Sequence, residues 1–382
     1  MVEAEDYATI IKKKMRILLL GEYSNVHWTL AEGLRALGHE VVVVSTGVYW
    51  KNYRRDVSLV RGSSGRWGTL RFLARLACEL PRMRGYDVVQ LINPIFLDLK
   101  SERIRPIYEY LRKHNKKVFL GAYGMDYYWV NTCRTTQTFR YSDFNFGSRL
   151  RTDDIAMAEV GDWIDTDKGR LNQEVAADCD GIIAGLYEYY ACYHPVFPEK
   201  TRFIPFPINT DAIVPTAPAV GSDGLVRFFI GVQRARSAYK GTDVMLRALE
   251  RVKAAYPDRC EVEKAESVPY PVYQHMMDSS HVLLDQLYSY TPAMNGLLAM
   301  AKGMVLVGGG EPENYEILGE RELRPIVNVV PDEDDVYSKL EQLELHPDDV
   351  NRRSADSRLY IERHHDYRKV AQQYVDFWTN TK

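Results

Sequence analysis

Short apolar runs alternate with amphipathic stretches along most of this chain. The runs at 15–20, 41–45, 87–92 and 117–120 are rich in Val, Ile and Leu and have the length of buried strands. Between them, stretches such as 26–37 carry apolar residues at helical spacing. Strands and helices that alternate in this way predict a parallel sheet with helices on both faces.

The alternation stops after residue 204 and restarts at residue 226. Residues 205–224 contain four prolines (Pro205, Pro207, Pro215 and Pro218) and show no helical period, which is typical of an interdomain linker. A chain of 382 residues is long enough for two domains. We therefore predict an α/β fold with two doubly wound domains facing a central cleft. The expected parts are a first domain at 1–207, a linker at 208–224, a second domain at 225–362 and a final helix at 363–382 that packs back on the first domain.

Residues 127–167 interrupt the first series. They are rich in Tyr, Arg, Asp and Phe and have no clear period. A segment of this length between regular elements is usually functional or disordered, and its aromatic content favours an ordered insertion.

Charge and composition narrow the possible partners. The chain has 49 Lys and Arg against 52 Asp and Glu, a net charge of −3, which argues against nucleic acid as a partner. Its five cysteines show no Cys-x-x-Cys spacing, which excludes a zinc ribbon and a disulfide framework and fits a reducing compartment. The sequence has no signal segment and no run of 18 apolar residues, so the expected compartment is the cytoplasm.

The loop after the first strand of the second series carries positive charge. Arg234, Arg236 and Lys240 lie between the strand end at Gly231 and a helix expected to begin after Gly241. Cations at the carboxyl edge of a sheet suit a diphosphate and can stabilise the charge that a leaving phosphate gains. A solvated basic loop without a ligand is the alternative.

A second polar loop follows the strand predicted at 282–287. Asp285 lies near the end of this strand, and Thr291 and Pro292 precede a helix rich in small residues. We expect Thr291 to be the N-cap and Pro292 the first helical residue. The free amides at this helix start, near Asn295, would then suit a phosphate. Close packing of the helix on the sheet would equally explain its Ala and Gly content.

Together these loops resemble glycosyltransferase family 4, whose members have the GT-B fold. The helix Leu298, Ala299, Met300, Ala301, Lys302 and Gly303 is similar to the family's Glu-Ala-Met-Ala-x-Gly helix. The other matching stretches are 17–41, 180–184, 203–209 and 307–313. The resemblance covers about residues 15–345. It implies two Rossmann-like domains, the N-terminal one on the acceptor side and the C-terminal one binding the nucleotide sugar.

The resemblance also assigns roles to single residues. Arg236, Lys240 and Asp126 are expected to be catalytic: the two cations would neutralise the departing diphosphate, and Asp126 would touch the donor sugar or the acceptor. The residues expected to bind the nucleotide sugar are Gly21, Ser24, Asn25, His27, Gly231, Gly241, Val268, Tyr270, Asp285, Tyr290, Thr291, Asn295, Gly296 and Glu313. His27 could instead be an ordinary first-turn residue of a helix, and Asp285 a satisfied buried acid. The family implies retention at the anomeric carbon, no cofactor and no obligatory metal.

One departure from the family matters for function. The family carries two glutamates eight positions apart, one facing the donor sugar and one facing the ribose hydroxyls, whereas this chain has Tyr290 and Leu298. A charged acceptor for a ribose hydroxyl is worth roughly 1.5–3 kcal/mol, so its loss would weaken binding without abolishing it. Three explanations are open: Glu311, Glu313 or Glu316 substitutes, the donor specificity differs, or activity is lost.

The expected function is transfer of a sugar from a nucleotide-diphosphate donor to a glycan or lipid-linked acceptor. By analogy with the family, we expect a role in bacterial surface polysaccharide synthesis. The first domain and residues 127–167 would hold the acceptor. One alternative, motivated by Tyr290 and Leu298, is a non-catalytic nucleotide-sugar-binding or partner protein of the same fold. The other is a sugar-nucleotide 2-epimerase, for which His27 and Asp126 would be the acid–base groups.

A basic amphipathic stretch at 67–84 suggests a further partner. Leu70, Leu73, Leu76, Ala77 and Leu80 form an apolar stripe beside Arg66, Arg71, Arg75, Arg82 and Arg84. Such a helix can lie on an anionic membrane, and Lys12, Lys13 and Lys14 would add to the attraction. This would give a peripheral membrane contact through the N-terminal domain. A helix packed on the core, with its cationic face in solvent, is the alternative.

Overall fold

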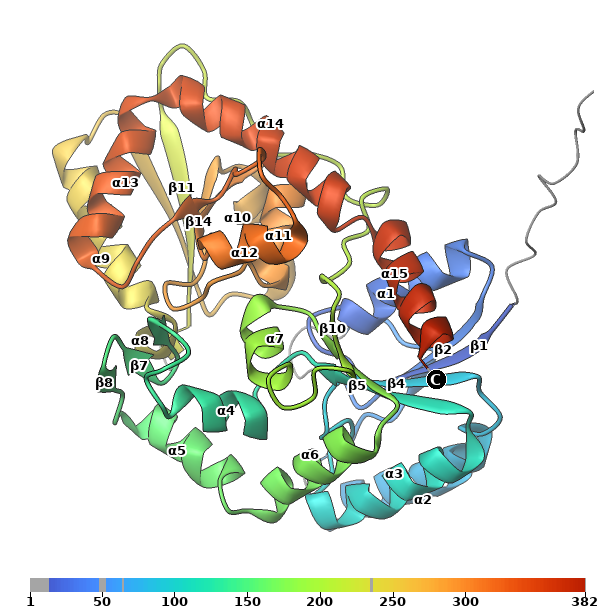
Figure 1. Ribbon diagram of the computed structural model, residues 1–382. Helices are drawn as coiled ribbons and strands as arrows, with labels where there is room; N and C mark the ends of the chain where they lie inside the picture. Colours follow the sequence, from blue (N-terminus) through green and yellow to red (C-terminus); the bar gives the residue numbers. More distant parts are fainter. Residues whose placement is uncertain (1–13, 48–52, 64, 234–235, 382) are drawn as a thin grey trace, which may run out of the picture.

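The computed structural model describes residues 14–47, 53–63, 65–233 and 236–381 (Figure 1). Lys12, Lys13 and Arg234, to which roles were assigned above, lie outside these residues. The strands are β1 (Arg16–Leu20), β2 (Glu40–Ser45), β3 (Val57–Ser58), β4 (Val88–Leu91), β5 (Lys117–Ala122), β6 (Tyr141–Ser142), β7 (Asn145–Phe146), β8 (Arg149–Leu150), β9 (Gly181–Ala184), β10 (Thr201–Phe203), β11 (Val226–Val232), β12 (Cys260–Glu266), β13 (Val282–Leu284), β14 (Val305–Gly308) and β15 (Val327–Asn328). The α-helices are α1 (Val26–Ala36), α2 (Arg66–Glu79), α3 (Ser101–His114), α4 (Tyr127–Cys133), α5 (Asp154–Trp163), α6 (Asp167–Asp178), α7 (Tyr187–Tyr193), α8 (Ser237–Lys240), α9 (Thr242–Ala255), α10 (Tyr270–Asp278), α11 (Met294–Ala301), α12 (Pro312–Leu318), α13 (Glu333–Leu345), α14 (Pro347–His364) and α15 (Tyr367–Asn380).

The first lobe is built on a seven-stranded sheet. Its strand order is β10-β9-β5-β4-β1-β2-β3, and every neighbouring pair is parallel. Residues 17–20 of β1 are fully buried, as a continuous apolar run predicts for a strand covered on both faces. After β1 the chain adds β2 on one side of it and later β4 on the other side. The carboxyl end of β1 is therefore a topological switch point of the sheet.

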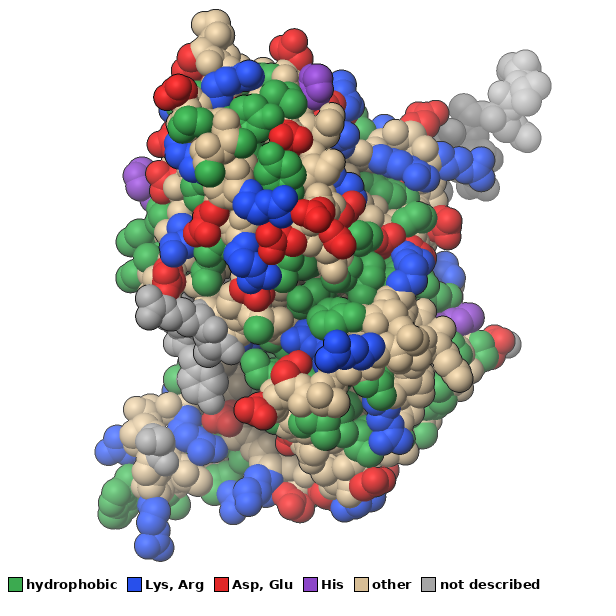
Figure 2. Space-filling model, turned by 90° about the vertical axis from the view of Figure 1, so that its left-hand side faces the viewer, with side chains coloured by type: hydrophobic (Ala, Val, Ile, Leu, Met, Phe, Trp, Pro, Cys, Tyr) green, Lys and Arg blue, Asp and Glu red, His purple; other side chains and the backbone are tan. Residues whose placement is uncertain are grey.

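The second lobe repeats this plan with a five-stranded sheet. The strand order is β12-β11-β13-β14-β15, again all parallel. Here β11 lies between β12 and β13 and creates a second switch point. The two sheets confirm the predicted α/β class and its doubly wound arrangement. Figure 2 shows Lys and Arg side chains interspersed with Asp and Glu on one side of the second lobe. Among the ion pairs of this lobe, Arg251 of α9 pairs with Glu333 and Asp334 of α13.

The insertion predicted at 127–167 is ordered. It contains α4, α5 and a three-stranded antiparallel sheet in the order β6-β7-β8. This small sheet lies against the second lobe, because Arg151 donates to the carbonyl of Tyr239 at 3.3 Å and stacks over the ring of Tyr288 at 5.1 Å. The insertion therefore connects the lobes on one side of the cleft.

The last helix, α15, lies along α1 of the first lobe (Figure 1). The two helices touch so closely at Gly33 that a Cβ there would lie 2.2 Å from the carbonyl oxygen of Tyr367. Lys117 of β5 donates to the carbonyl oxygen of Trp378 at 2.9 Å and so ties the end of α15 to the first sheet. The exact domain boundaries given above stay a prediction.

Two local predictions were wrong. Thr291 is not a helix cap: α11 begins at Met294 with Ala293 as its N-cap. Only part of the apolar stripe predicted on α2 faces the core. Leu76 is buried, but Leu70 is 57% exposed, and Phe72 packs inward instead. Phe72 lies four residues before Leu76, so the buried face is displaced from the predicted one.

Candidate functional site

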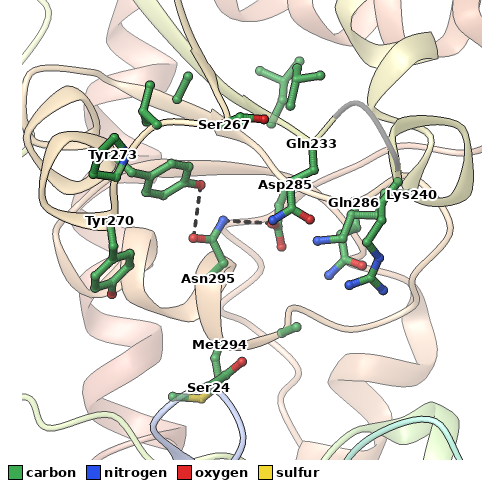
Figure 3. Close-up of a pocket in the computed structure, with 18 of the residues that line it drawn as sticks. Ser24, Gln233, Lys240, Ser267, Tyr270, Tyr273, Asp285, Gln286, Met294 and Asn295 are labelled. Atoms are coloured by element: carbon green, nitrogen blue, oxygen red, sulfur yellow. Dashed lines mark hydrogen bonds between the residues drawn. The ribbon is translucent and has the colours of Figure 1, made fainter. Parts of the chain in front are cut away.

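The main pocket lies at the carboxyl ends of β11, β12 and β13 and has a volume of about 990 Å³ (Figure 3). It is lined by the segments that follow these strands and by Ser24, which reaches it from the β1–α1 turn of the first lobe. Ligands of open α/β sheets bind at such switch points. The lining residues are Ser24, Gly231, Val232, Gln233, Arg236, Lys240, Ala265, Ser267, Val268, Pro269, Tyr270, Pro271, Tyr273, Leu284, Asp285, Gln286, Ala293, Met294 and Asn295.

Two smaller spaces adjoin the main pocket. The outer compartment, of about 380 Å³, is bordered by Trp28 of α1 and Leu298 of α11. The inner compartment, of about 170 Å³, is bordered by Glu188 of α7. Both share Ser24 and Met294 with the main pocket, so the three spaces meet between the lobes.

The short helix α8 places two cations at the main pocket. Lys240 is its last residue and Arg236 its N-cap. Gly241 then reverses the chain with a φ of 73°, and a Cβ there would lie 2.5 Å from the Cβ of Leu287, so this turn requires glycine.

Lys240 is half-buried and, within the described part of the chain, its ammonium group has no hydrogen-bond or ion-pair partner. Burial lowers the pKa of Lys240, while the charge of Asp285 acts in the opposite direction. An anion that entered the main pocket would therefore meet a cation that no described protein group neutralises through an ion pair.

A chain of hydrogen bonds fixes the floor of the pocket (Figure 3). The amide of Asn295 donates to Asp285 at 2.9 Å, and the hydroxyl of Tyr273 donates to Asn295 at 3.2 Å. Tyr273 packs against Gly231, where a Cβ would lie 2.8 Å from its ring. Asp285 and Asn295 are thus held in one orientation before any ligand binds.

The start of α11 has no side-chain cap. Its N-cap, Ala293, has no side-chain acceptor, so the first amides of the helix are not capped by their own N-cap residue. Met294 and Asn295, the first residues of the helix, line the main pocket. An uncapped helix start that lines the same pocket as Lys240 is a suitable place for a phosphate group.

The β1–α1 turn brings the first lobe to the pocket. Ser24 and Asn25 both have left-handed backbone conformations, with φ of 52° and 72°. Beneath this turn, the carboxylate of Glu22 accepts a hydrogen bond from the backbone N–H of Trp28 at 2.8 Å. Glu22 is buried, and burial raises its pKa to about 8. The amides of α1 are therefore already partly satisfied from within the chain.

No family model matches this chain, and no curated protein matches it in sequence. Its structure is nevertheless similar to several solved structures over almost its whole length. Sucrose-phosphate synthase from Thermosynechococcus elongatus matches with a TM-score of 0.59 and 12% identity, over 95% of this chain and 98% of the other. HepE from Anabaena, in complex with UDP and glucose, matches with a TM-score of 0.58 and 10% identity, over 96% and 99%. The catalytic domain of starch synthase IV from Arabidopsis thaliana, bound to ADP and acarbose, matches with a TM-score of 0.57 and 9% identity, over 97% and 99%.

These proteins are GT-B glycosyltransferases, and the match extends over both lobes and the segment between them. The chain has the GT-B fold. This confirms the predicted architecture of two Rossmann-like domains. Membership of family 4 stays a prediction.

The GT-B cleft brings together many of the residues predicted to form the site. Those that line the main pocket are Ser24, Gly231, Arg236, Lys240, Val268, Tyr270, Asp285 and Asn295. Asn25 borders the outer compartment and Thr291 the inner one. Their proposed roles stay predictions.

Asp126 and His27 lie away from these three spaces. Asp126 is fully buried as the N-cap of α4 and accepts hydrogen bonds from the amide of Trp129 at 2.9 Å and the hydroxyl of Tyr193 at 2.8 Å. Burial raises its pKa to about 7. His27 is also fully buried, its Nδ1 lies 2.8 Å from the carbonyl oxygen of Gly21, and burial lowers its pKa to about 3. Both side chains serve packing and helix geometry, and neither lines the cleft.

The remaining predicted residues also lie beside the cleft rather than in it. Gly21, Gly241 and Gly296 permit close packing; a Cβ at Gly21 would lie 2.2 Å from Ile92, and one at Gly296 3.0 Å from Leu306. Tyr290 is buried, and its hydroxyl accepts a hydrogen bond from the amide of Arg140 at 2.7 Å.

The three acids considered as substitutes for the family glutamates, Glu311, Glu313 and Glu316, do not line the cleft either. The Arg140 guanidinium pairs with Glu313 at 2.5 Å and holds the pKa of Glu313 below its usual value. Glu311 pairs with Arg140 and with the hydroxyl of Tyr141, and Glu316 is exposed. None of the three borders the cleft as described.

Sequence reasoning missed Glu188 and Asp143, which both border the inner compartment. Glu188 is a single acid within a run of tyrosines, and Asp143 lies in the insertion. No local signal in the sequence marks Glu188, because its place at the site depends on a contact with residues 290 and 291 of the other lobe.

In the described ranges, no group of three His, Cys, Asp or Glu side chains is arranged to hold a metal ion. No helix within this part of the chain is long and apolar enough to cross a bilayer.

Proposed function

We propose that this chain transfers a sugar from a nucleotide-diphosphate donor to a glycan or lipid-linked acceptor, with retention at the anomeric carbon. The observation that carries the proposal is Lys240, whose ammonium group has no partner among the described residues and which lines the main pocket of a GT-B cleft together with Arg236 and the uncapped start of α11. The similar structures of HepE and starch synthase IV contain UDP with glucose and ADP with acarbose, which supports a nucleotide diphosphate as the ligand.

The chemistry follows from the charges in the main pocket. Transfer breaks the bond between the anomeric carbon and the β-phosphate oxygen, forms a bond from that carbon to the acceptor oxygen, and releases the acceptor's hydroxyl proton. The leaving diphosphate gains negative charge, which Lys240, Arg236 and the amides of α11 would stabilise. Stabilisation of this kind lowers the barrier because it is stronger in the transition state than in the bound donor.

The acceptor would bind against the first lobe. Trp28 borders the outer compartment, and an indole ring can stack on a sugar; the guanidinium of Arg35 lies over this ring at 5.0 Å. The insertion reaches the inner compartment through Trp129 and Asp143, so it borders the cleft as expected of an acceptor-binding segment. A bacterial surface polysaccharide, or its lipid-linked precursor, is the acceptor that we propose.

We also propose that the first lobe contacts the cytoplasmic face of a membrane. On α2, Trp67 and Leu70 are 76% and 57% exposed and lie close to Arg66 and Arg71. Exposed aromatic and aliphatic side chains beside arginines suit an anionic interface. Sedimentation with vesicles of phosphatidylglycerol and phosphatidylcholine tests this: replacement of Trp67 and Leu70 by serine should abolish binding, and unchanged binding would contradict it.

The experiment that tests the main proposal is calorimetry with UDP, GDP and ADP, followed by product analysis with the matching nucleotide sugars. Binding of at least one diphosphate and release of that diphosphate from a nucleotide sugar would support transfer. The failure of all three to bind would refute it.

One observation favours a second candidate, binding without transfer. Where the family places two carboxylates, Tyr290 is buried against Arg140 and Leu298 gives the outer compartment an apolar wall. A protein that binds a diphosphate but turns over no donor with any acceptor would fit this candidate. The 2-epimerase alternative gains no support, because His27 and Asp126 do not border the cleft.

A further inference from the structure

The cleft has opposite charges at its two ends. Two cations, Lys240 and Arg236, and one acid, Asp285, border the main pocket, whereas the charged residues that border the inner compartment are both acids, Asp143 and Glu188. The two spaces share Ser24, Gln286, Ala293 and Met294, so a ligand whose phosphates lie at α8 can extend into the inner compartment.

Glu188 of the first lobe forms hydrogen bonds with the loop that precedes α11 in the second lobe. Its side chain is buried, and Oε1 accepts hydrogen bonds from the backbone N–H groups of Tyr290 at 2.8 Å and Thr291 at 3.1 Å. The hydroxyl of Thr291 donates to Oε2. Glu188 thus brings a carboxylate from α7 to the backbone of the loop that carries Tyr290, whereas the phenol of Tyr290 bonds the amide of Arg140.

Glu188 also has no cation beside it. Within the described ranges, no Lys, Arg or His forms an ion pair with Glu188. Burial raises the pKa of Glu188, and the groups that act in the opposite direction are hydrogen-bond donors. Asp143 differs, because Arg151 and Arg236 lie close enough to act on its charge, and its Oδ2 accepts a hydrogen bond from the hydroxyl of Tyr239 at 2.8 Å. Glu188 is therefore the less compensated of the two charges.

Hydrogen-bond donors surround the carboxylate of Glu188. The backbone N–H groups of Tyr290 and Thr291, the hydroxyl of Thr291 and its own backbone N–H all donate to it, so its charge is held by dipoles and not by a cation. A second carboxylate brought into the same space would be repelled and would lose its hydration without a compensating partner. A sugar that carries only hydroxyl groups, or an ammonium group, meets no such repulsion.

We propose that the inner compartment receives the donor's sugar, and that Glu188, assisted by Asp143, selects sugars without a carboxylate over uronic acids. This inference rests on the proposed function, because it takes the phosphates to lie at Lys240. The chemical class selected is a neutral or amino sugar attached to a nucleoside diphosphate.

The test is calorimetry at pH 8 on the full chain, first with UDP, GDP and ADP. For a nucleoside diphosphate that binds, the corresponding nucleotide hexose and nucleotide uronate are then compared, for example UDP-glucose with UDP-glucuronate. We expect the uronate to bind at least tenfold more weakly than the hexose form.

Three variants complete the test. Glu188→Gln keeps an acceptor oxygen for the amides of Tyr290 and Thr291 but removes the charge, so the ratio of the two dissociation constants should fall at least threefold. Asp143→Asn should lower it less and serves as the second variant if Glu188→Gln does not fold. Glu344→Gln, a fully buried acid of α13 outside the cleft, is the matched control and should leave the ratio unchanged.

The outcomes separate the two proposals. If no diphosphate binds, the proposed function fails. If a diphosphate binds but the hexose and uronate forms bind equally, or if the ratio stays constant in both cleft variants, the charge-selection proposal alone is overturned.

Discussion

Replacing Lys240 with alanine removes a cation whose ammonium group has no hydrogen-bond or ion-pair partner in the described structure. A hydrogen bond between charged groups is worth about 1.5–3 kcal/mol, and a pair of unit charges 4 Å apart gains about 4 kcal/mol at the effective dielectric constant near a protein surface. A loss of about 2–3 kcal/mol corresponds to a dissociation constant for the bound nucleoside diphosphate that rises roughly 30- to 150-fold. The folding free energy should change by less than about 0.5 kcal/mol, since no internal partner is lost.

Calorimetry measures the first quantity and urea unfolding the second. Lys240→Arg keeps the charge and should retain most of the affinity. Lys339→Ala, which removes a lysine paired with Asp335 on α13 outside the cleft, is the matched control. An affinity within threefold of the wild type for Lys240→Ala would refute the argument, as would a loss of folding free energy above about 2 kcal/mol, because Lys240 would then hold the fold rather than the ligand.

Three further predictions concern the fold, its pH dependence and the outer compartment. Gly33→Ala should cost about 1–3 kcal/mol in urea unfolding, because the new Cβ would lie 2.2 Å from the carbonyl oxygen of Tyr367, whereas Gly161→Ala on α5, with open space around it, should be neutral or stabilising; equal effects would contradict the close helix contact. Because burial raises the pKa of Glu22 from 4.5 to about 8, the native state retains a proton that the unfolded state loses, so Glu22 makes stability fall as pH rises from about 4.5 to about 8. Glu22→Gln should reduce that fall by a few kcal/mol in unfolding measured across this range, and an unchanged slope would be inconsistent with a buried, protonated carboxyl. Leu298→Glu should place an acceptor for ribose hydroxyls in the outer compartment and lower the dissociation constant of the bound diphosphate about tenfold; an equal gain for the 2′,3′-dideoxy form would show that the hydroxyls are not the partners.

Most of the fold was predictable because the strands and helices of both lobes have local sequence patterns that indicate them. The apolar run of β1 and the helical spacing of α1 follow from which faces are buried. The start of α11 was predicted wrongly because Thr291 and Pro292 have the composition of a helix start, whereas Thr291 instead bonds Glu188 across the cleft. A tertiary contact of that kind leaves no local signal.

The candidate site was predicted where it depends on strand ends and was missed where it depends on packing between lobes. Lys240 and Asp285 follow strands of one sheet, so their edge could be inferred. Asp126 follows β5 in the same way, yet it caps α4, because an acid after a strand looks alike in sequence whether it caps a helix or borders a cleft. Glu188 lies about a hundred residues from the loop that it contacts, and nothing in its neighbourhood along the chain indicates that pairing.

The position of the diphosphate is the most direct test of the central claim. A crystal structure of the chain with a nucleoside diphosphate should show both phosphates between α8 and the first turn of α11, within hydrogen-bond distance of Lys240. Phosphates bound beyond the reach of Lys240, or a main pocket that stays empty while the ligand binds elsewhere, would contradict it.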